Sequence, residues 1–309
     1  MSFLINMPSR NTDKLRERLS QDIPLSEIEI YPDVQKPEDV EFALVWHHQP
    51  GSLKQFPNLK AISSFGAGVD SILSDPELPD VPITRIVDSW LASDMAKFIV
   101  TTIQQHTLRF AQFRQQQSQQ LWKPKSKRKG NRVGILGLGQ LGQKAAELLN
   151  LFGYQVSGWS QSVKKLTDVN CLTGEDAFRE LVQGSDYLVC LLPLTPETTG
   201  ILNEDVFRLM PNDSVLINVA RGQHVVERDL LAALNAQQLE HAYLDVFSTE
   251  PLPPQHDFWV HPNITITPHI SAVTDLETAV SQIVENYQRL KATGNVVSLK
   301  HVINIEKGY

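Results

Sequence analysis

The sequence is poor in cysteine and has no long apolar run. Only Cys171 and Cys190 occur among its 309 residues. Two cysteines are too few for a disulfide framework or a cysteine-based metal cluster, so we expect reduced thiols, no metal site and a cytoplasmic location. No stretch reaches the ~18 apolar residues of a membrane span, and the start MSFLINMPSRNTDK has no small-residue cleavage site of the kind that ends a signal peptide. We therefore expect no membrane partner.

Basic residues are outnumbered by acidic ones. The chain has 28 Lys and Arg against 35 Asp and Glu, a formal net charge of -7. Because binding to nucleic-acid phosphates needs clustered cations, we expect no nucleic-acid partner. The one basic run, KPKSKRK at 123–129, is broken by Pro124 and followed by Gly130, and we interpret it as a solvated linker.

The length and the pattern of apolar residues predict two domains of the α/β class. Apolar residues make up 41% and charged residues 20% of the chain, which is typical of a soluble globular protein long enough for two cores. Strand-like runs alternate with helical stretches, which predicts two doubly wound parallel sheets. The strand-like runs are FLIN, FALVW, LKAISS and PITRIV in the first ninety residues, then RVGILGLG, YQVSGW, YLVCLL, SVLINV, AYLDV and ITITP.

Two long helical stretches divide the chain. One runs from Asp94 to about Gln120, and the other from about Thr274 to Ala292, ending at Gly294. We expect both to cross between domains, which makes the first domain discontinuous. The predicted domains are residues 1–98 with 272–309, and residues 99–271.

A glycine-rich turn indicates a dinucleotide site in the second domain. Gly137, Gly139 and Gly142 form GLGQLG directly after the apolar RVGIL and before the helical KAAELLNLF. The first glycine permits a tight turn, the second lets the backbone approach a pyrophosphate, and the third lets the helix pack on the strand. The helix N-terminus then faces the phosphates. A purely structural strand-to-helix turn is the alternative.

The next predicted strand ends without the acidic residue that usually binds the adenosine ribose. The stretch GWSQSVKK at 158–165 instead offers Ser160, Gln161, Ser162 and Lys164. A carboxylate would repel a 2′-phosphate, whereas hydroxyl, amide and ammonium groups can bind one. We therefore expect NADP(H) to be preferred, with NAD(H) possible. The alternative is a solvated turn whose lysines face water.

Three polar residues stand at or just beyond the ends of predicted strands, where ligands of doubly wound sheets bind. They are Arg221 in INVARG, Glu250 in DVFSTEPLPP and His269 in ITPHISA. An arginine suits a carboxylate, and a histidine with a carboxylate partner can act as a general acid. Taken singly, Arg221 could cap a loop, Glu250 could be a surface turn residue, and His269 could be a core histidine.

These motifs resemble the D-isomer-specific 2-hydroxyacid dehydrogenases over nearly the whole chain. Within that family the chain is most similar to the glyoxylate/hydroxypyruvate reductase A group, which also shows ALVWH near the N-terminus and a terminal KGY. The resemblance is carried by SFGAGVDSIL, GILGLGQLG, LLPLTPETTGILN, LINVARGQHVVERDLLAAL and LDVFSTEPLPPQHDFWVHPNITITPHISA.

The resemblance implies a role for each matching residue. Arg221, Glu250 and His269 match the catalytic set, with Arg221 and His269 also binding the substrate. Ala67 and Gly68 match the loop whose backbone amides bind the substrate carboxylate, and Trp46 is expected to line the pocket. The remaining residues expected to contact the cofactor are Gln140, Leu141, Leu192, Pro193, Thr198, Ala220 and Asp245.

The family fold implied is a Rossmann cofactor domain with a discontinuous flavodoxin-like substrate domain, commonly in a homodimer. The expected activity is reduction of small 2-keto acids, glyoxylate to glycolate and hydroxypyruvate to D-glycerate, with His269 as general acid. The group binds NADPH through arginines in a Ser-Arg-x-Arg-Lys stretch, but here Gln161 and Val163 occupy those positions. Two alternatives stay open: an NAD-dependent dehydrogenase of phosphoglycerate or a bulkier keto acid, and a non-enzymatic nucleotide-sensing scaffold or corepressor.

Overall fold

The computed structural model describes residues 1–8 and 10–305 of the chain. It divides into two compact units. The first unit is Met1–Ser89 with the chain from Thr274 onward, and the second unit is Trp90–Val273. The borders that we expected, after residues 98 and 271, lie close to these, while the assignment of a substrate and a cofactor domain remains a prediction. The terminal KGY motif lies outside the described residues.

The first unit contains a five-stranded parallel sheet in the order β2-β1-β3-β4-β5. Its strands are β1 (Ser2–Asn6), β2 (Ile28–Ile30), β3 (Val40–Val45), β4 (Ala61–Ser64) and β5 (Ile83–Thr84). Its helices are α1 (Asp13–Leu19), α2 (Asp70–Leu73) and α9 (Leu276–Thr293), with 3₁₀ turns at Leu25–Glu27, Pro37–Asp39 and Val296–Ser298.

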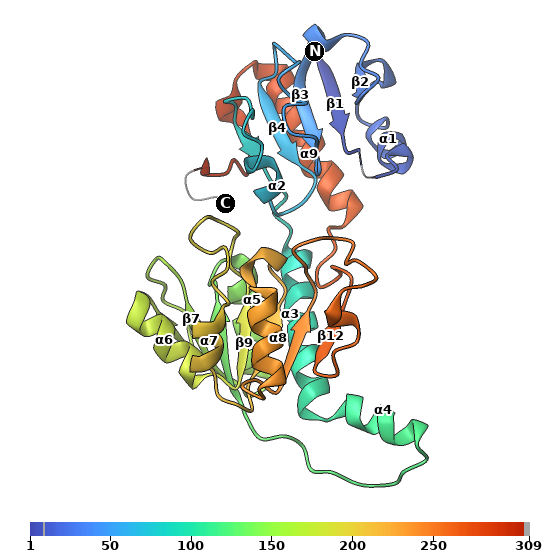
Figure 1. Ribbon diagram of the computed structural model, residues 1–309. Coiled ribbons are helices and arrows are strands. Elements are labelled where there is room, and N and C mark those ends of the chain that lie inside the picture. Colours follow the sequence, from blue (N-terminus) through green and yellow to red (C-terminus); the bar gives the residue numbers. More distant parts are fainter. Residues whose placement is uncertain (9, 306–309) are drawn as a thin grey trace. The chain divides into compact units, whose positions relative to one another are not determined.

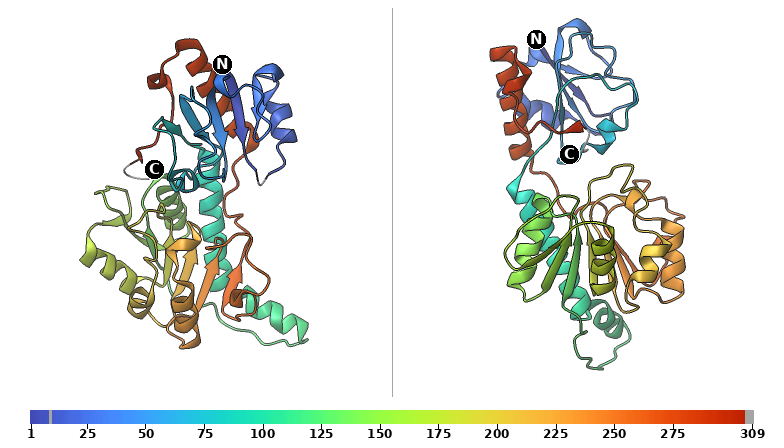
Figure 2. Two further views of the ribbon diagram at one scale, coloured as in Figure 1. Left: turned by 45° about the horizontal axis from the view of Figure 1, so that its top comes forward. Right: turned by 90° about the vertical axis from the view of Figure 1, so that its left-hand side faces the viewer.

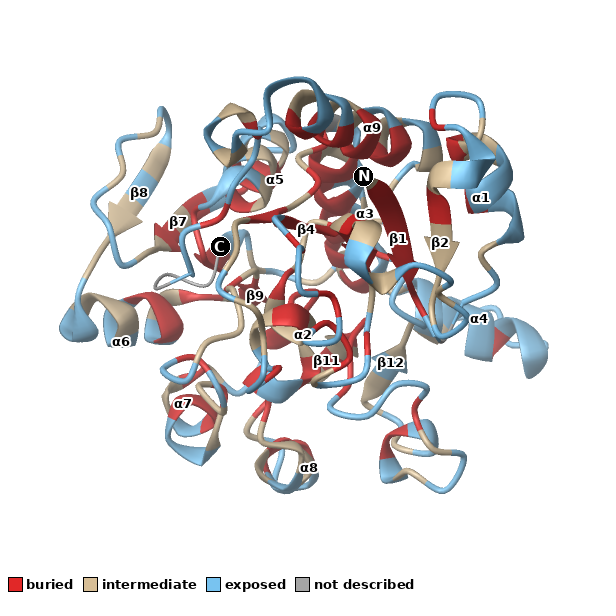
Figure 3. Cartoon of the chain, turned by 90° about the horizontal axis from the view of Figure 1, so that it is seen from above, coloured by how far each residue is buried: buried red, intermediate tan, exposed pale blue. Residues whose placement is uncertain are grey.

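Alternating side chains of these strands supply two cores, one on each face of the sheet. Phe3 and Phe42 point to one face and pack against Tyr287 of α9, with ring centroids 5.3 and 5.8 Å from the tyrosine ring. Leu4 and Ala43 point to the other face, away from α9. Figure 3 shows β1 buried along its length, and Figure 1 shows α9 lying along this sheet.

The second unit contains a seven-stranded parallel sheet in the order β12-β11-β10-β9-β6-β7-β8. The strands are β6 (Arg132–Leu136), β7 (Gln155–Trp159), β8 (Val169–Leu172), β9 (Tyr187–Cys190), β10 (Val215–Asn218), β11 (His241–Leu244) and β12 (Ile264–Ile266). The helices are α3 (Ser89–Thr107), α4 (Phe110–Ser118), α5 (Gln140–Leu151), α6 (Glu175–Gly184), α7 (Glu204–Leu209) and α8 (Glu227–Asn235), with 3₁₀ turns at Gly222–His224 and Asp257–Trp259.

The strand order of the second unit reverses its direction between β6 and β9. In open α/β sheets the crevice at this switch point, outside the carboxyl ends of the strands, is where ligands bind. Both faces of the sheet are covered by apolar clusters, one built on Leu136 and Leu188 and the other on Ile135 and Val189. The expected α/β class with two doubly wound parallel sheets is confirmed.

Two long helices were expected at the ends of the first unit. The bounds predicted for one are wrong, and those predicted for the other agree with the structure. The expected single helix from Asp94 to Gln120 is wrong, because Arg109 adopts a left-handed conformation (φ 61°) that separates α3 from α4. Helix α9 agrees with its prediction: the Asp275 side chain caps Thr278 N–H, and Gly294 ends the helix at φ 64°. Among the described residues, no helix has both the length and the apolar content to cross a membrane.

Candidate active site

The glycine loop links β6 to α5 at the switch point. Gly137 has a φ of 104°, a conformation that L side chains rarely adopt. A Cβ at Gly142 would lie 1.9 Å from the Gly137 carbonyl oxygen, so any side chain there would push the helix off the turn. A Cβ at Gly139, by contrast, would meet no atom within 4 Å. Gly139 therefore borders open space at the start of α5.

This loop fits the pyrophosphate of a dinucleotide. The residue before α5, Gly139, has no side chain to cap the helix, and Gln143 N–H makes the first bond to the Gly139 carbonyl, at 2.9 Å. The N–H groups of Gln140, Leu141 and Gly142 come before the first bond within the helix, so they point outward from its N-terminus. The positive end of the helix dipole lies at the same place. Such an end binds phosphate.

The loop after β9 lies directly beside the glycine loop. A Cβ at Gly137 would be 2.6 Å from the Leu191 carbonyl oxygen. The buried Thr198 hydroxyl donates to the Pro193 carbonyl at 2.7 Å, and Leu192 is buried beneath. These contacts fix the loop beside the glycine loop, while contact of Leu192, Pro193 and Thr198 with the cofactor remains a prediction.

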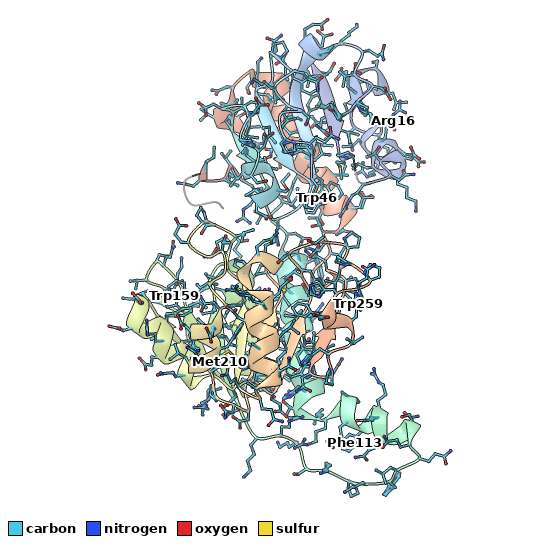
Figure 4. The ribbon with its side chains drawn as sticks, viewed as in Figure 1. Arg16, Trp46, Phe113, Trp159, Met210 and Trp259 are labelled. Carbon is cyan, nitrogen blue, oxygen red and sulfur yellow. The ribbon has the colours of Figure 1, made fainter. Side chains whose placement is uncertain are left out.

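The stretch after β7 presents polar groups without a carboxylate. Trp159, labelled in Figure 4, ends the strand and donates its indole N–H to the Gly174 carbonyl at 2.8 Å. Ser160 donates its hydroxyl to the Ser162 carbonyl at 2.8 Å, which closes a tight turn. Gln161 and Ser162 are exposed and Lys164 is half-buried. The turn can therefore offer an amide and an ammonium group to a 2′-phosphate.

Arg221 follows β10 and precedes the 3₁₀ turn Gly222–His224. Asn218 donates its side-chain amide to the Arg221 carbonyl at 2.8 Å and accepts the Ala220 N–H at 3.2 Å, so the turn is fixed from the end of the strand. The guanidinium donates to the carbonyl of the buried Ala220 at 2.7 Å. This folds the arginine side chain back along its own loop.

His224 is a site residue that the sequence pattern did not reveal. It is fully buried, and its Nε2 lies 3.2 Å from the Pro193 carbonyl oxygen. Its Nδ1 lies 3.2 Å from the Arg221 backbone nitrogen and 3.1 Å from the Arg221 carbonyl oxygen. One imidazole thus joins the candidate substrate arginine to the candidate cofactor loop. The only signal in the sequence was its spacing of three residues from Arg221.

His269 and Glu250 form a hydrogen-bonded pair. His269 Nδ1 lies 2.8 Å from Glu250 Oε2, and Glu250 Oε1 accepts the Phe247 N–H at 3.0 Å. Because a carboxylate only accepts, Nδ1 carries the proton and Nε2 is left to exchange a proton elsewhere. The His269 side chain is 42% exposed, so the interpretation of it as a core histidine is wrong.

The charge of Glu250 is stabilised by its neighbours. Partial burial alone would raise the pKa of its carboxyl, but the hydrogen bonds from His269 and from Phe247 N–H, with the charges of His269 and Arg221, lower that pKa overall. The field of Arg221 therefore reaches the His269–Glu250 pair. Arg221 thus lies within electrostatic range of Glu250 in the second unit, although 48 residues separate Arg221 from His269.

Asp245 holds the loop that carries His269. Its carboxylate accepts from the Thr267 hydroxyl at 2.5 Å and from the backbone N–H of Ile270 and Ser271 at 2.9 and 2.8 Å. The His269 N–H donates to the Asp245 carbonyl at 2.8 Å. These bonds keep His269 at a φ of 53°, a conformation that costs on the order of 1–3 kcal/mol outside glycine. The contact of Asp245 with a nicotinamide amide remains a prediction.

The predicted substrate residues Trp46, Ala67 and Gly68 belong to the first unit, where Trp46 follows β3 and the other two follow β4. Ser64 Oγ accepts the Gly66 N–H at 3.2 Å and donates to the Gly68 carbonyl at 2.8 Å, which shapes the loop. Among the described residues, no acceptor is found for the N–H groups of Ala67 and Gly68. No cluster of three or more metal-ligating side chains occurs in the described part of the chain.

Comparisons with known proteins agree with this geometry. Residues 100–271 match the family "D-isomer specific 2-hydroxyacid dehydrogenase, NAD binding domain". The chain is 40% identical to glyoxylate/hydroxypyruvate reductase A of Yersinia enterocolitica over 88% of each chain. It is similar to a D-isomer specific 2-hydroxyacid dehydrogenase of Xanthobacter autotrophicus in complex with NADPH and MES (TM-score 0.90, 35% identity, 100% and 99% of the two chains covered).

It is also similar to an NADPH-dependent glyoxylate/hydroxypyruvate reductase of Sinorhizobium meliloti in complex with NADP and sulfate (TM-score 0.90, 31% identity, 100% of both chains covered). Fold, glycine loop and the hydrogen-bonded His269–Glu250 pair point the same way as these similarities. The chain belongs to the D-isomer specific 2-hydroxyacid dehydrogenase family.

Proposed function

We propose that this protein reduces small 2-keto acids with NADPH, converting glyoxylate to glycolate and hydroxypyruvate to D-glycerate. The observation that carries the proposal is the His269 Nδ1–Glu250 Oε2 bond of 2.8 Å beside Arg221, in the unit that also holds the glycine loop. Similar proteins named glyoxylate/hydroxypyruvate reductase A support the choice of substrates.

Each residue has a distinct task in this reaction. Arg221 binds the substrate carboxylate and the carbonyl oxygen, because a planar guanidinium can donate two parallel hydrogen bonds. His269 gives its Nε2 proton to the carbonyl oxygen, and Glu250 stabilises the imidazolium from the Nδ1 side. A bound reduced nicotinamide would supply the hydride. Hydride and proton together convert the keto acid to the hydroxy acid.

In the first unit, Ala67 and Gly68 bind the substrate carboxylate through their backbone N–H groups. The support is that both donors lack an acceptor among the described residues, in a loop held by Ser64. Trp46 lines the pocket, and its ring lies against this loop: a Cβ at Gly66 would be 2.4 Å from the Trp46 ring.

The activity is tested by steady-state kinetics on glyoxylate, hydroxypyruvate and pyruvate, and on phosphorylated and bulkier 2-keto acids, each with NADPH and with NADH. We expect turnover of the first two substrates. Turnover only of phosphorylated or bulkier acids with NADH would favour another dehydrogenase of the family, and no turnover of any keto acid would favour a nucleotide-sensing scaffold.

The preference for NADPH is proposed from the stretch 160–165. No carboxylate there opposes a 2′-phosphate, and Gln161, Ser162 and Lys164 can donate to one. Structures similar to this chain contain NADPH or NADP. We expect a higher kcat/KM for NADPH than for NADH, and a smaller ratio in Lys164→Met. Equal kcat/KM values for both cofactors in the unchanged enzyme would contradict the proposal.

We also propose a homodimer. In Figures 1 and 2, α4 and the chain after it project from the rest of the second unit. This segment exposes large apolar side chains: Phe110 is 54%, Leu121 is 48% and Trp122 is 97% exposed. Exposed aromatic clusters of this kind are typical of protein interfaces, and we take a second copy as the partner.

Light scattering tests this assembly. The unchanged protein should have about twice the mass of one chain, and a variant with Leu121→Ser and Trp122→Ser should dissociate. Trp259→Ser is the control, because Trp259 is 51% exposed but lies outside the projecting segment. A monomeric mass for the unchanged protein would contradict the homodimer.

We further propose a cytoplasmic location, supported by two free cysteines, of which Cys190 is buried. We also propose that the protein has no nucleic-acid or membrane partner.

A further inference from the structure

Arg10 stacks on two aromatic rings in the first unit. It follows β1, and its guanidinium carbon lies 5.2 Å from the centroid of the Trp46 ring and 5.5 Å from that of Phe65. The two rings themselves meet edge to face at 6.5 Å. Cation–π contacts of this kind hold a guanidinium in place while leaving its N–H groups free to donate.

The same rings belong to the proposed site for the substrate carboxylate. Phe65 directly precedes the Gly66–Gly68 loop, and the Trp46 ring lies against Gly66. Arg10, Trp46 and this loop therefore form one contiguous cluster within the first unit. The cluster combines a guanidinium with the backbone N–H donors of Ala67 and Gly68, which lack an acceptor among the described residues.

The positive charge of Arg10 is not balanced by a neighbouring acid. No ion pair or side-chain hydrogen bond of Arg10 is found within the part of the chain that the structure describes. Arg18 of the same unit, by comparison, binds both Asp22 and Glu277 at 2.7 Å. An arginine held by stacking rather than by a carboxylate keeps its hydrogen-bonding capacity for an anion.

Arg10 also lines a pocket with a volume of about 290 Å³. The pocket lies where β1, β2 and β3 end, between Met7, Ile30, Tyr31 and Gln49. The carboxyl ends of parallel strands are the places where α/β sheets bind ligands. Its lining offers no carboxylate, and Arg10 is its one charged side chain among the described residues.

We propose that Arg10 selects 2-keto acids that carry a second anionic group at the end remote from the keto acid function. The inference rests on the proposed function, since the first carboxylate is taken to bind the amides of Ala67 and Gly68. Glyoxylate and hydroxypyruvate have no second charge for Arg10 to bind. A short dicarboxylic 2-keto acid has one, and its second carboxylate accepts from the Arg10 guanidinium.

The test compares substrates of equal chain length that end in a carboxylate or in a methyl group. Steady-state kinetics with saturating NADPH would use 2-oxobutanedioate against 2-oxobutanoate, and 2-oxopentanedioate against 2-oxopentanoate, with glyoxylate as the reference. The variants are Arg10→Met and Arg10→Lys. The matched control is Arg16→Met, because Arg16 is an exposed arginine on α1 of the same unit, well apart from Trp46 in Figure 4.

We expect the unchanged enzyme to prefer at least one dicarboxylate over the matching monocarboxylate. Arg10→Met should reduce that preference by about tenfold to a hundredfold, as the loss of a charge-assisted hydrogen bond predicts, and should lower kcat/KM for the dicarboxylates more than for glyoxylate. Arg10→Lys should keep part of the preference, and Arg16→Met all of it.

Three results would overturn the inference: no preference for either dicarboxylate, a preference that survives Arg10→Met, or an equal loss for glyoxylate and dicarboxylates. All three leave glyoxylate reduction by the unchanged enzyme in place. An enzyme that reduces no keto acid at all would overturn the proposed function itself, and this inference with it.

Discussion

The proton on His269 Nδ1 is held by one acceptor, the Glu250 carboxylate at 2.8 Å. The pKa of that carboxyl is lowered: burial opposes the charge, but the bonds from His269 and Phe247 outweigh it. Because this pKa is lowered, the His269–Glu250 pair is intact at pH values above the ordinary pKa of a carboxyl group. It breaks only as the pH falls through the lowered pKa of Glu250. The histidine therefore has a charged partner throughout neutral pH.

Glu250→Gln tests this partnership. Glutamine can still accept the Nδ1–H but brings no charge to stabilise an imidazolium, so we expect kcat to fall roughly tenfold to a hundredfold. Steady-state kinetics with glyoxylate and NADPH measure this loss. The control is Glu227→Gln, which removes a similar carboxylate from His256 at 3.1 Å. An unchanged kcat in Glu250→Gln would show that the carboxylate only orients the ring.

The sequence allowed some site residues to be predicted and not others. Arg221, Glu250 and His269 could be recognised because polar residues at strand ends of a parallel sheet face one edge. The bridge made by His224, and the way Asp245 holds residues 267–271, could not. Both depend on backbone groups of folded loops, which all residue types share and which leave no mark on the sequence.

At the scale of elements, Gly139 and Gly142 at the start of α5 should respond differently to the same change. Gly142→Ala would place a Cβ 1.9 Å from the Gly137 carbonyl, whereas Gly139→Ala meets no atom within 4 Å and has an ordinary φ of -73°. We expect Gly142→Ala to lower the Tm by several degrees, as a loss of about 1–3 kcal/mol predicts.

Gly139→Ala should keep the Tm of the unchanged protein and raise the Kd for NADPH, because the methyl group stands where the pyrophosphate approaches. Thermal unfolding and NADPH fluorescence titration measure the two effects. Unchanged NADPH binding by Gly139→Ala would indicate that the turn is purely structural.

Strands and helices were predictable where several apolar residues follow one another. The buried strands β1, β3, β6, β9 and β10 were recognised by such runs. Strands β2 (IEI) and β8 (VNCL) were missed, because Glu29 and Asn170, residue types that are rare in strands, interrupt these short apolar runs. The break between α3 and α4 was missed since Arg109 has no sequence signal for its left-handed conformation.

At the scale of the whole molecule, His106 links stability to pH. Its burial, with the charges of Arg128, His241 and Arg109, lowers its pKa to about 3. Glu240 lies 3.6 Å from His106 Nε2 but is paired with Arg128. Because the folded pKa is below the unfolded value near 6.5, the unfolded chain binds more protons as the pH falls, and the free energy of unfolding drops with it.

Denaturant unfolding of the second unit at several pH values checks this. Between pH 6.5 and 5, His106 should lower the free energy of unfolding by about 2 kcal/mol. His106→Gln should lose that part of the pH dependence whatever its stability at neutral pH, while His261→Gln should keep it. The same slope in His106→Gln and the unchanged protein would show that other groups titrate there.

The central claim is that His269 gives the proton to the substrate while Arg221 and Glu250 hold the reacting groups. The most direct measurement is kcat for glyoxylate with saturating NADPH in His269→Asn, with the Kd for NADPH measured alongside. Asparagine can still bind Glu250 but donates no proton to the carbonyl oxygen. We predict a kcat lower by about 10²–10⁴ with an unchanged Kd for NADPH; near-normal turnover in this variant would contradict the account.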